Sequence, residues 1–266
     1  MNAFEDIGGV VVQQFAYLGG LTDQFWSGLR AMPRVLPVIG RRGRWQTSIR
    51  QMAAIGVAAL PMLGIMAICA GMILALQGGA ELRRFGALRY VIDLVAVGFT
   101  RELGPLLTAI VVSGRSGSAF SAEIGTMMVT NEIDALRVMA LDPIEFVLAP
   151  KYLAAIIMVP CLTVMCNVFG ITAGAGFMYL STKMTFGIYL RYVFDSIVLR
   201  DVLSGLVKSL AFATIIVHVG CMEGFKVQGG PEAVGRATTS AVVKSTFLVI
   251  LADLFFTAIF YLAGWQ

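Results

Sequence analysis

Three charged residues stand inside one of the most apolar parts of the chain. Arg101, Glu102 and Arg115 lie within FTRELGPLLTAIVVSGRSGSAF, which covers residues 99–120. A charged side chain at the centre of a membrane span costs about 2.5–3.5 kcal/mol on insertion scales, unless it faces protein, water or an opposite charge. Arg101 and Glu102 therefore indicate either a binding or translocation chamber or an internal ion pair that joins two spans. Physical reasoning from the sequence supports these two alternatives equally.

The helix that carries these charges is expected to be irregular beside them. Pro105 has no backbone N–H, so the carbonyl of Arg101 loses its usual helical donor. Neighbouring side chains on a helix point about 100° apart, so Arg101 and Glu102 face different surroundings. Broken helices with open backbone at membrane depth usually line a cavity. The pattern predicts a kink or a locally open turn at this point.

Other reactive side chains do not form a catalytic or metal-binding pattern. The four cysteines, Cys69, Cys161, Cys166 and Cys221, have no C-x-x-C spacing, and His218 is the only histidine. The serines of the central motif have no neighbouring base that would activate a nucleophile. We expect no catalytic residue, no metal site and no disulfide framework, and we interpret His218 and the cysteines as helix-packing residues.

Composition identifies the environment of the chain. Of 266 residues, 58% are hydrophobic and 14% are charged, with a mean hydropathy of +0.83. An ordinary soluble domain is about one-quarter charged, so we expect an integral membrane protein. The net charge of +4 comes from basic residues beside apolar runs, which suits lipid headgroups rather than nucleic acid. The first twelve residues contain Glu5 and Asp6 and no base, which is unlike a secretory signal peptide.

Five apolar segments are long enough to span a bilayer. They are predicted at residues 51–80, 91–114, 152–182, 202–222 and 242–264, and Pro160 is expected to interrupt the third. The fold class expected is an all-α integral membrane protein. One orientation places twelve Lys and Arg residues on one side and six on the other. The positive-inside rule then predicts a cytoplasmic N-terminus and a C-terminus on the external side.

The N-terminal region, residues 1–50, is expected to differ from the five-span domain, residues 51–266. Before Pro33 its apolar residues recur at spacings of three and four, at Phe4, Ile7, Val11, Leu18, Leu21 and Phe25. This periodicity predicts an amphipathic helix that lies on the membrane as an elbow before the first span. A helix packed on other protein explains the same periodicity equally well.

A short helix is predicted between the second and third spans. In TNEIDALRVMALDPIEF it begins near Thr130 or Asn131, and Ile133, Leu136 and Met139 or Ala140 form an apolar ridge. Its size fits a groove on a partner protein, although an ordinary connecting helix is the favoured interpretation of this segment alone. The chain has no G-x-x-x-x-G-K-[ST] phosphate loop. If ATP drives this protein, a different chain must hydrolyse it.

Small residues recur at four-residue intervals on two faces of the central motif. One face carries Gly114, Ser118 and Ala122, and the other carries Gly117, Ser121 and Gly125. Both predict close contacts, between spans or between identical subunits.

Three motifs in order resemble the MlaE family of permeases. They are GMILALQG, then RELGPLLTAIVVSGRSGSAFSAEIGTMMVTNEIDALRVMALDP, then EGFKVQGGPEAVGRATTSAVV. These permeases are the membrane subunits of ABC transporters that move phospholipids between the inner and outer membranes of Gram-negative bacteria. The resemblance implies a homodimer in the inner membrane and a cytoplasmic MlaF-like ATPase. It also implies a periplasmic MlaD-like hexamer of MCE-domain proteins and a STAS-domain MlaB-like protein that binds the ATPase.

The resemblance also implies roles for particular residues. Leu74, Gln77, Arg101 and Glu102 would line or gate a lipid cavity. The short helix would couple the chain to the ATPase through Glu132, Ile133, Asp134, Leu136, Arg137 and Met139. No cofactor is expected in this chain, and ATP would bind the partner ATPase.

Two other classes of function compete with an ABC permease. An ATP-independent secondary lipid transporter or channel commonly contains internal repeats, but five spans do not divide into two halves. An intramembrane lipid enzyme needs a nucleophile, base or metal cluster within a span, and His218 stands alone. The sequence therefore favours the permease.

Overall fold

The computed structural model describes residues 42–264, and every regular element among them is helical. Contacts within the chain group residues 1–45 and residues 46–266 into two separate units. Five of its segments are long and apolar enough to cross a membrane, which confirms the predicted all-α, five-span fold. The predicted amphipathic helix and its prolines, at residues 1–41, lie outside the described residues.

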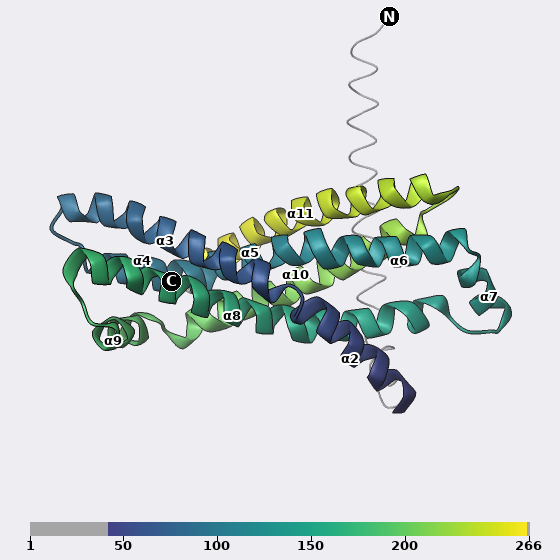
Figure 1. Ribbon diagram of the computed structural model, residues 1–266, viewed down its shortest axis with the longest axis horizontal. Helices are drawn as coiled ribbons and strands as arrows, with labels where there is room; N and C mark the ends of the chain where they lie inside the picture. Colours follow the sequence, from purple (N-terminus) through teal and green to yellow (C-terminus); the bar gives the residue numbers. More distant parts are fainter. Residues whose placement is uncertain (1–41, 265–266) are drawn as a thin grey trace, which may run out of the picture. The chain divides into compact units, whose positions relative to one another are not determined.

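The elements follow one another in this order (Figure 1). The first span, Ser48–Arg84, lies in α2 (Arg42–Gly56) and α3 (Leu60–Arg84). The second comprises α4 (Tyr90–Gly98), the π-helical turn η2 (Phe99–Leu103), α5 (Gly104–Val112), the π-helical turn η3 (Ser113–Gly117) and α6 (Ser118–Val129). The short helix α7 (Glu132–Val138) precedes the third span, η4 (Ile144–Leu148) and α8 (Ala149–Thr182). After α9 (Phe186–Ser196), the last two spans are α10 (Leu199–Phe225) and α11 (Pro231–Leu262).

The second span is longer than predicted. It continues past Gly114 to Val129, so Arg115 lies within the helix and not in the following loop. The Arg115 Nη1 donates to the carbonyl of Ala54 at 3.2 Å, which ties the second span to α2. The prediction was wrong because a charge inside a spanning helix was taken as the end of that helix.

One expectation about helix continuity was also wrong. The third span is not interrupted by Pro160, since α8 runs through it for 34 residues. In the first span a turn at residues 57–59 separates α2 from α3. A proline removes one backbone hydrogen bond and distorts a helix. Membrane helices tolerate this when neighbouring elements support the freed backbone.

Glycines allow the spans to approach one another closely. A Cβ at Gly71 of α3 would lie 2.1 Å from the carbonyl oxygen of Gly170 in α8, and one at Gly220 of α10 would lie 2.8 Å from that of Gly117. The predicted small-residue face at Gly117 therefore contacts α10. Nothing lies within 4 Å of the Cβ position of Gly114, which belongs to the other face.

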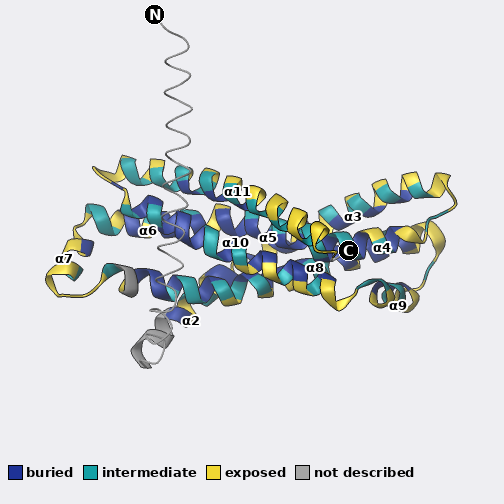
Figure 2. Cartoon of the chain, turned by 180° about the vertical axis from the view of Figure 1, so that it is seen from behind, coloured by how far each residue is buried: buried dark blue, intermediate teal, exposed yellow. Residues whose placement is uncertain are grey.

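Helix α10 is central to the bundle, and α11 lies on its surface. Contacts from α10 reach α5, α6, α8 and α11. The most apolar window of α10 is 56% buried, compared with 11% for α11. Figure 2 shows this contrast, with exposed residues most frequent in the half of α11 that ends at Leu262. In a membrane this apolar surface faces lipid or another protein.

We predict that Gly205→Ala destabilises the protein. A Cβ at this position of α10 would lie 2.2 Å from the backbone oxygen of Thr100, so the two spans must separate. Overpacking of this kind costs about 1–3 kcal/mol, which thermal unfolding of the purified protein would measure as a lower Tm.

Gly235→Ala is the matched control, because Gly235 is also helical and nothing lies within 4 Å of its Cβ position. Alanine favours a helix interior over glycine by up to about 1 kcal/mol, so this variant should keep or raise the Tm. Equal Tm values for the two variants would contradict the close contact at Gly205.

Candidate functional site

The two charges of the second span lie on a π-helical turn that Pro105 follows directly. The N–H of Gly104 donates to the carbonyl of Phe99, five residues earlier, which closes the wide ring of a π-helix. Pro105 cannot donate to Arg101, so the turn widens where the α-helical pattern would fail. The predicted irregularity is confirmed as this turn, η2. Such turns occur frequently at functional sites.

Helix α10 meets this turn through one face. Asp201, Gly205 and Lys208 are four and three residues apart, so they lie on the same side of the helix. Gly205 contacts the backbone of the turn at Thr100. Asp201 lies about one helical turn before Gly205, and Lys208 lies about one helical turn after it. Their side chains therefore pass on opposite sides of η2. This arrangement gives Arg101 and Glu102 separate partners on α10.

Arg101 pairs with Asp201. Its Nε lies 2.6 Å from Oδ1 of Asp201, whose side chain is only 2% exposed. The second oxygen, Oδ2, accepts the backbone N–H of Val198 at 2.9 Å and so caps the start of α10. A carboxylate in the first turn of a helix is also favoured by the helix dipole. Asp201 thus fixes both Arg101 and the first turn of α10.

Glu102 belongs to a cluster around Lys208, whose side chain is 1% exposed. The Lys208 Nζ lies 2.5 Å from Oε2 of Glu102 and 2.9 Å from Oδ1 of Asp253 in α11. It also donates to the hydroxyl of Thr257 at 2.8 Å, and that hydroxyl donates to Glu102 at 3.2 Å. Three spans therefore meet at one buried ammonium group.

These five charged residues, Arg101, Glu102, Asp201, Lys208 and Asp253, are called the charged network below. Arg101 is eleven residues from the start of its span, Lys208 is nine from the start of α10, and Asp253 is nine from the end of α11. At 1.5 Å per residue these depths are all roughly 13–17 Å. Arg101, Lys208 and Asp253 thus lie well inside their spanning segments, toward the end of the bundle that carries α9, while Asp201 is two residues from the start of α10.

Every residue of the charged network has an oppositely charged partner, but two of the side chains remain partly exposed. The side chain of Arg101 is 28% exposed and that of Glu102 is 40% exposed, while their partners on α10 are buried. The structure therefore contains the internal ion pairs that were one interpretation of the sequence. It also leaves charged surface at membrane depth, as the other interpretation requires.

The remaining predicted cavity residues lie on α3. Leu74 is half-buried, and its Cδ2 lies 3.7 Å from the Cβ position of Gly98, immediately before η2. Gln77 is exposed. No hydrogen bond among the described side chains joins Gln77 to Arg101 or Glu102. The structure thus brings Leu74 to the π-helical turn and places Gln77 on the outer surface of α3.

The short helix α7 lies at the same end of the long helices as the connection between α10 and α11 (Figure 1). Ile133 is 1% exposed and anchors the helix to the bundle, and Leu136 is half-buried. Glu132 accepts a hydrogen bond from Thr130 at 3.0 Å, and Arg137 pairs with Asp134 at 2.9 Å. Most of the predicted ridge therefore points inward. Its exposed apolar part is Met139, together with Val138.

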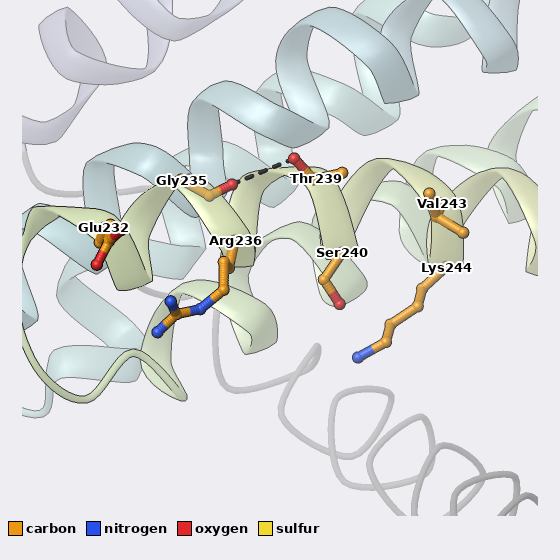
Figure 3. A pocket seen from close by; sticks show the side chains of 7 residues that line it. All are labelled: Glu232, Gly235, Arg236, Thr239, Ser240, Val243 and Lys244. Carbon is orange, nitrogen blue, oxygen red and sulfur yellow. Dashed lines mark hydrogen bonds between the residues drawn. The ribbon is translucent and has the colours of Figure 1, made fainter.

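Two hollows occur near this end. One of about 360 Å³ lies beside α7 and is lined by Met128, Arg137, Asp142, Pro143, Leu148, Met222 and Phe225. The other, of about 570 Å³, follows the first turns of α11 from Glu232 to Lys244 (Figure 3). Ser240 and Lys244, which line the second hollow, bind Glu223 of α10 at 2.7 and 2.8 Å. This second polar contact between α10 and α11 is far from the charged network.

The sequence interpretation missed the partners of Arg101 and Glu102. Lys208 and Asp253 were visible as charges within apolar segments, but no role was assigned to them. A requirement that every charge at membrane depth has an opposite neighbour would have connected them to Glu102. Asp201 was less visible because it lies at a helix start, where an acid has a simpler explanation.

Comparisons with known proteins agree with the motifs. The sequence model of the family described as "Permease MlaE" matches residues 48–259. The intermembrane phospholipid transport system permease protein MlaE of Haemophilus influenzae is 31% identical over 265 residues, covering 99% of both chains. A probable ABC transporter permease protein of Rickettsia typhi is 39% identical over 80% of this chain and 82% of its own. The chloroplastic protein TRIGALACTOSYLDIACYLGLYCEROL 1 of Arabidopsis thaliana is 35% identical over 89% of this chain and 69% of its own.

We predict that Lys208→Met strongly destabilises the protein. The substitution leaves two carboxylates at membrane depth without their cation. Breaking one side of a buried ion pair costs about 3–5 kcal/mol, which thermal unfolding would detect. The triple variant with Glu102→Gln and Asp253→Asn removes the uncompensated charges, so it should recover part of the lost stability. A triple variant less stable than Lys208→Met alone would rule out this account.

Proposed function

The chain belongs to the MlaE permease family, and from this membership we propose that it is the membrane subunit of an ABC transporter that moves phospholipids between the two membranes of a Gram-negative bacterium. It is a multi-pass membrane protein whose five spans are described above. The observation that carries the proposal is the charged network at membrane depth, because Arg101 and Glu102 keep exposed surface there.

A lipid pathway needs an apolar wall with few polar groups. Exposing acyl chains to water costs about 0.8 kcal/mol per methylene, so the tails must remain covered throughout transfer. Leu74 beside η2 provides apolar surface, and Arg101 and Glu102 provide charge for a headgroup. Five spans are few to enclose a two-chain lipid, and a twofold homodimer doubles them. The exposed apolar surface of α11 is available for such a dimer.

ATP would be hydrolysed by a separate chain, so this chain acts as a transport subunit and not as an enzyme. Membership of a permease family and similarity to probable ABC transporter permeases support this division. In this proposal α7 is the coupling helix, because it is anchored by Ile133 and leaves Glu132, Val138 and Met139 exposed. The partner would be an MlaF-like ATPase, with an MlaB-like protein bound to it.

The remaining partners follow from the proposed site in the inner membrane. The N-terminus and α7 would face the cytoplasm, with the C-terminus and α9 on the periplasmic side. An MlaD-like hexamer of MCE-domain proteins would cover that side and receive or deliver the lipid. An ATP-independent channel is the competing function, and a requirement for an ATPase distinguishes the two.

We predict that the chain, purified with its native partners, yields phospholipid on extraction and that Leu74→Arg abolishes this. An arginine at position 74 places a charge on the apolar wall beside Gly98. Mass spectrometry of the extract would measure bound lipid, with ATPase activity measured alongside. Leu74→Met is the matched control, since it keeps an apolar side chain of similar size at the same position. The proposed lipid cavity would be contradicted if the wild-type protein yielded no phospholipid, or if both variants yielded equal amounts of it.

We predict that Arg137→Ala separates ATP hydrolysis from lipid transfer. Arg137 is exposed on α7, where it pairs with Asp134 three residues earlier. The control is Arg84→Ala, because Arg84 forms a comparable exposed pair with Glu81 at the opposite end of the long helices. Lipid transfer per ATP hydrolysed, measured in proteoliposomes, should fall several-fold for Arg137→Ala only. Unchanged coupling in Arg137→Ala would exclude this docking assignment.

A further inference from the structure

The charged network contains more acids than bases. Arg101 and Lys208 face three carboxylates, those of Glu102, Asp201 and Asp253. With ordinary ionisation the network carries one surplus negative charge, and such a charge is costly at membrane depth. Arg101 and Asp201 balance one another. The surplus therefore lies at Lys208, which has two carboxylate neighbours.

The surplus charge is accessible at Glu102. Lys208 and Asp201 are nearly inaccessible, and the side chain of Asp253 is 15% exposed, compared with 40% for Glu102. A cation that approaches from the exposed side therefore meets the Glu102 carboxylate first. An ammonium group suits this place, because it neutralises the charge and donates to carboxylate oxygens.

Arg101 offers the complementary group on the other side of the turn. Its Nε donates to Asp201, while neither of its two Nη atoms donates a hydrogen bond to another described residue. Those atoms are arranged as a fork that matches two oxygens of a phosphate. The partly exposed face of the network thus has a phosphate-binding end at Arg101 and an ammonium-binding end at Glu102.

We propose that the charged network selects a zwitterionic phosphate–ammonium headgroup, with the phosphate on Arg101 and a primary ammonium on Glu102. Asp201 and Lys208, which hold these two residues, are seven positions apart, or about 10 Å along α10. A phosphate and an amine joined by two carbons bridge this separation when a hydrogen bond of about 3 Å extends from each end. This inference rests on the proposed function and gives its substrate a headgroup class.

An anionic headgroup satisfies only half of the site. The phosphate of phosphatidylglycerol binds Arg101 equally well, but its hydroxyl groups leave the Glu102 carboxylate without a countercharge. Phosphatidylethanolamine with identical acyl chains differs only at that end. Comparison of these two lipids therefore isolates the contribution of Glu102.

The test is a competition between these lipids for the purified complex of the chain with its native partners. The complex is incubated with an equimolar mixture of the two lipids and repurified, and bound lipid is quantified by mass spectrometry. We expect the ethanolamine lipid to be enriched on the order of tenfold, as one charge-assisted hydrogen bond provides. Glu102→Gln keeps the shape and removes the charge, so the ratio of the two lipids should fall to about one.

Two further variants make the result specific. Asp253→Asn also removes the surplus charge, so its ratio should fall even if Glu102→Gln fails to assemble. Glu81→Gln, at an exposed carboxylate outside the network, should keep the wild-type ratio.

A displacement experiment tests whether the acyl chains are needed. Free glycerophosphoethanolamine carries the same headgroup without acyl chains, and it should not displace bound lipid at equal concentration.

Each contrary result has a distinct meaning. Equal recovery of both lipids by the wild type would overturn this inference and leave the proposed function standing, as expected if a proton balances the surplus charge. An unchanged ratio in Glu102→Gln and Asp253→Asn would likewise overturn it. Displacement by glycerophosphoethanolamine would overturn the assignment to a lipid headgroup. Recovery of no phospholipid at all would instead count against the proposed function.

Discussion

The structure depends on one constraint, that charges at membrane depth must have partners within the protein. Lys208 is almost fully buried, and its ammonium group has ligands on the second and fifth spans. An unpaired ammonium there would cost several kcal/mol, so α10 can take its central place only with η2 and α11 beside it. The same requirement joins Asp201 to Arg101. The charges that make the sequence unusual for a membrane protein therefore specify how three of its spans pack.

Backbone shape makes this pairing possible. Pro105 removes a donor, η2 widens the helix before it, and Gly205 lets α10 approach the widened turn at Thr100. A side chain at position 205 would hold the helices apart and draw Asp201 and Lys208 away from their partners. A proline and a glycine on different spans thus act together, although neither carries a polar side chain. Their effect is to direct Arg101 and Glu102 to opposite sides of one contact.

The sequence predicted what depends on local composition and missed what depends on packing. Apolar run length predicted the five spans, and α7 appeared where capping residues and a short apolar ridge indicated a helix. The boundary of the second span was predicted wrongly at Arg115. The sequence alone does not distinguish an arginine in a loop from one within a helix whose side chain donates to the carbonyl of Ala54. Ile133 and Met139 share a predicted ridge, but only tertiary contacts decide that the first is buried. The partners of Arg101 and Glu102 are 100 or more residues away, beyond any local pattern.

The weakly buried α11 connects this architecture to transport. Two polar contacts join it to α10, at Lys208 with Asp253 and, nine residues nearer the start of α11, at Glu223 with Lys244. Between them much of its apolar surface faces away from the bundle. Elements with few buried contacts open at the lowest free energy, so displacement of α11 disturbs the bundle less than displacement of α10. If a headgroup amine binds Glu102 as proposed above, it competes with the hydroxyl of Thr257 on α11, which donates to the same carboxylate. In that proposal, the binding of the amine and the contact of α11 with the second span would depend on the same carboxylate.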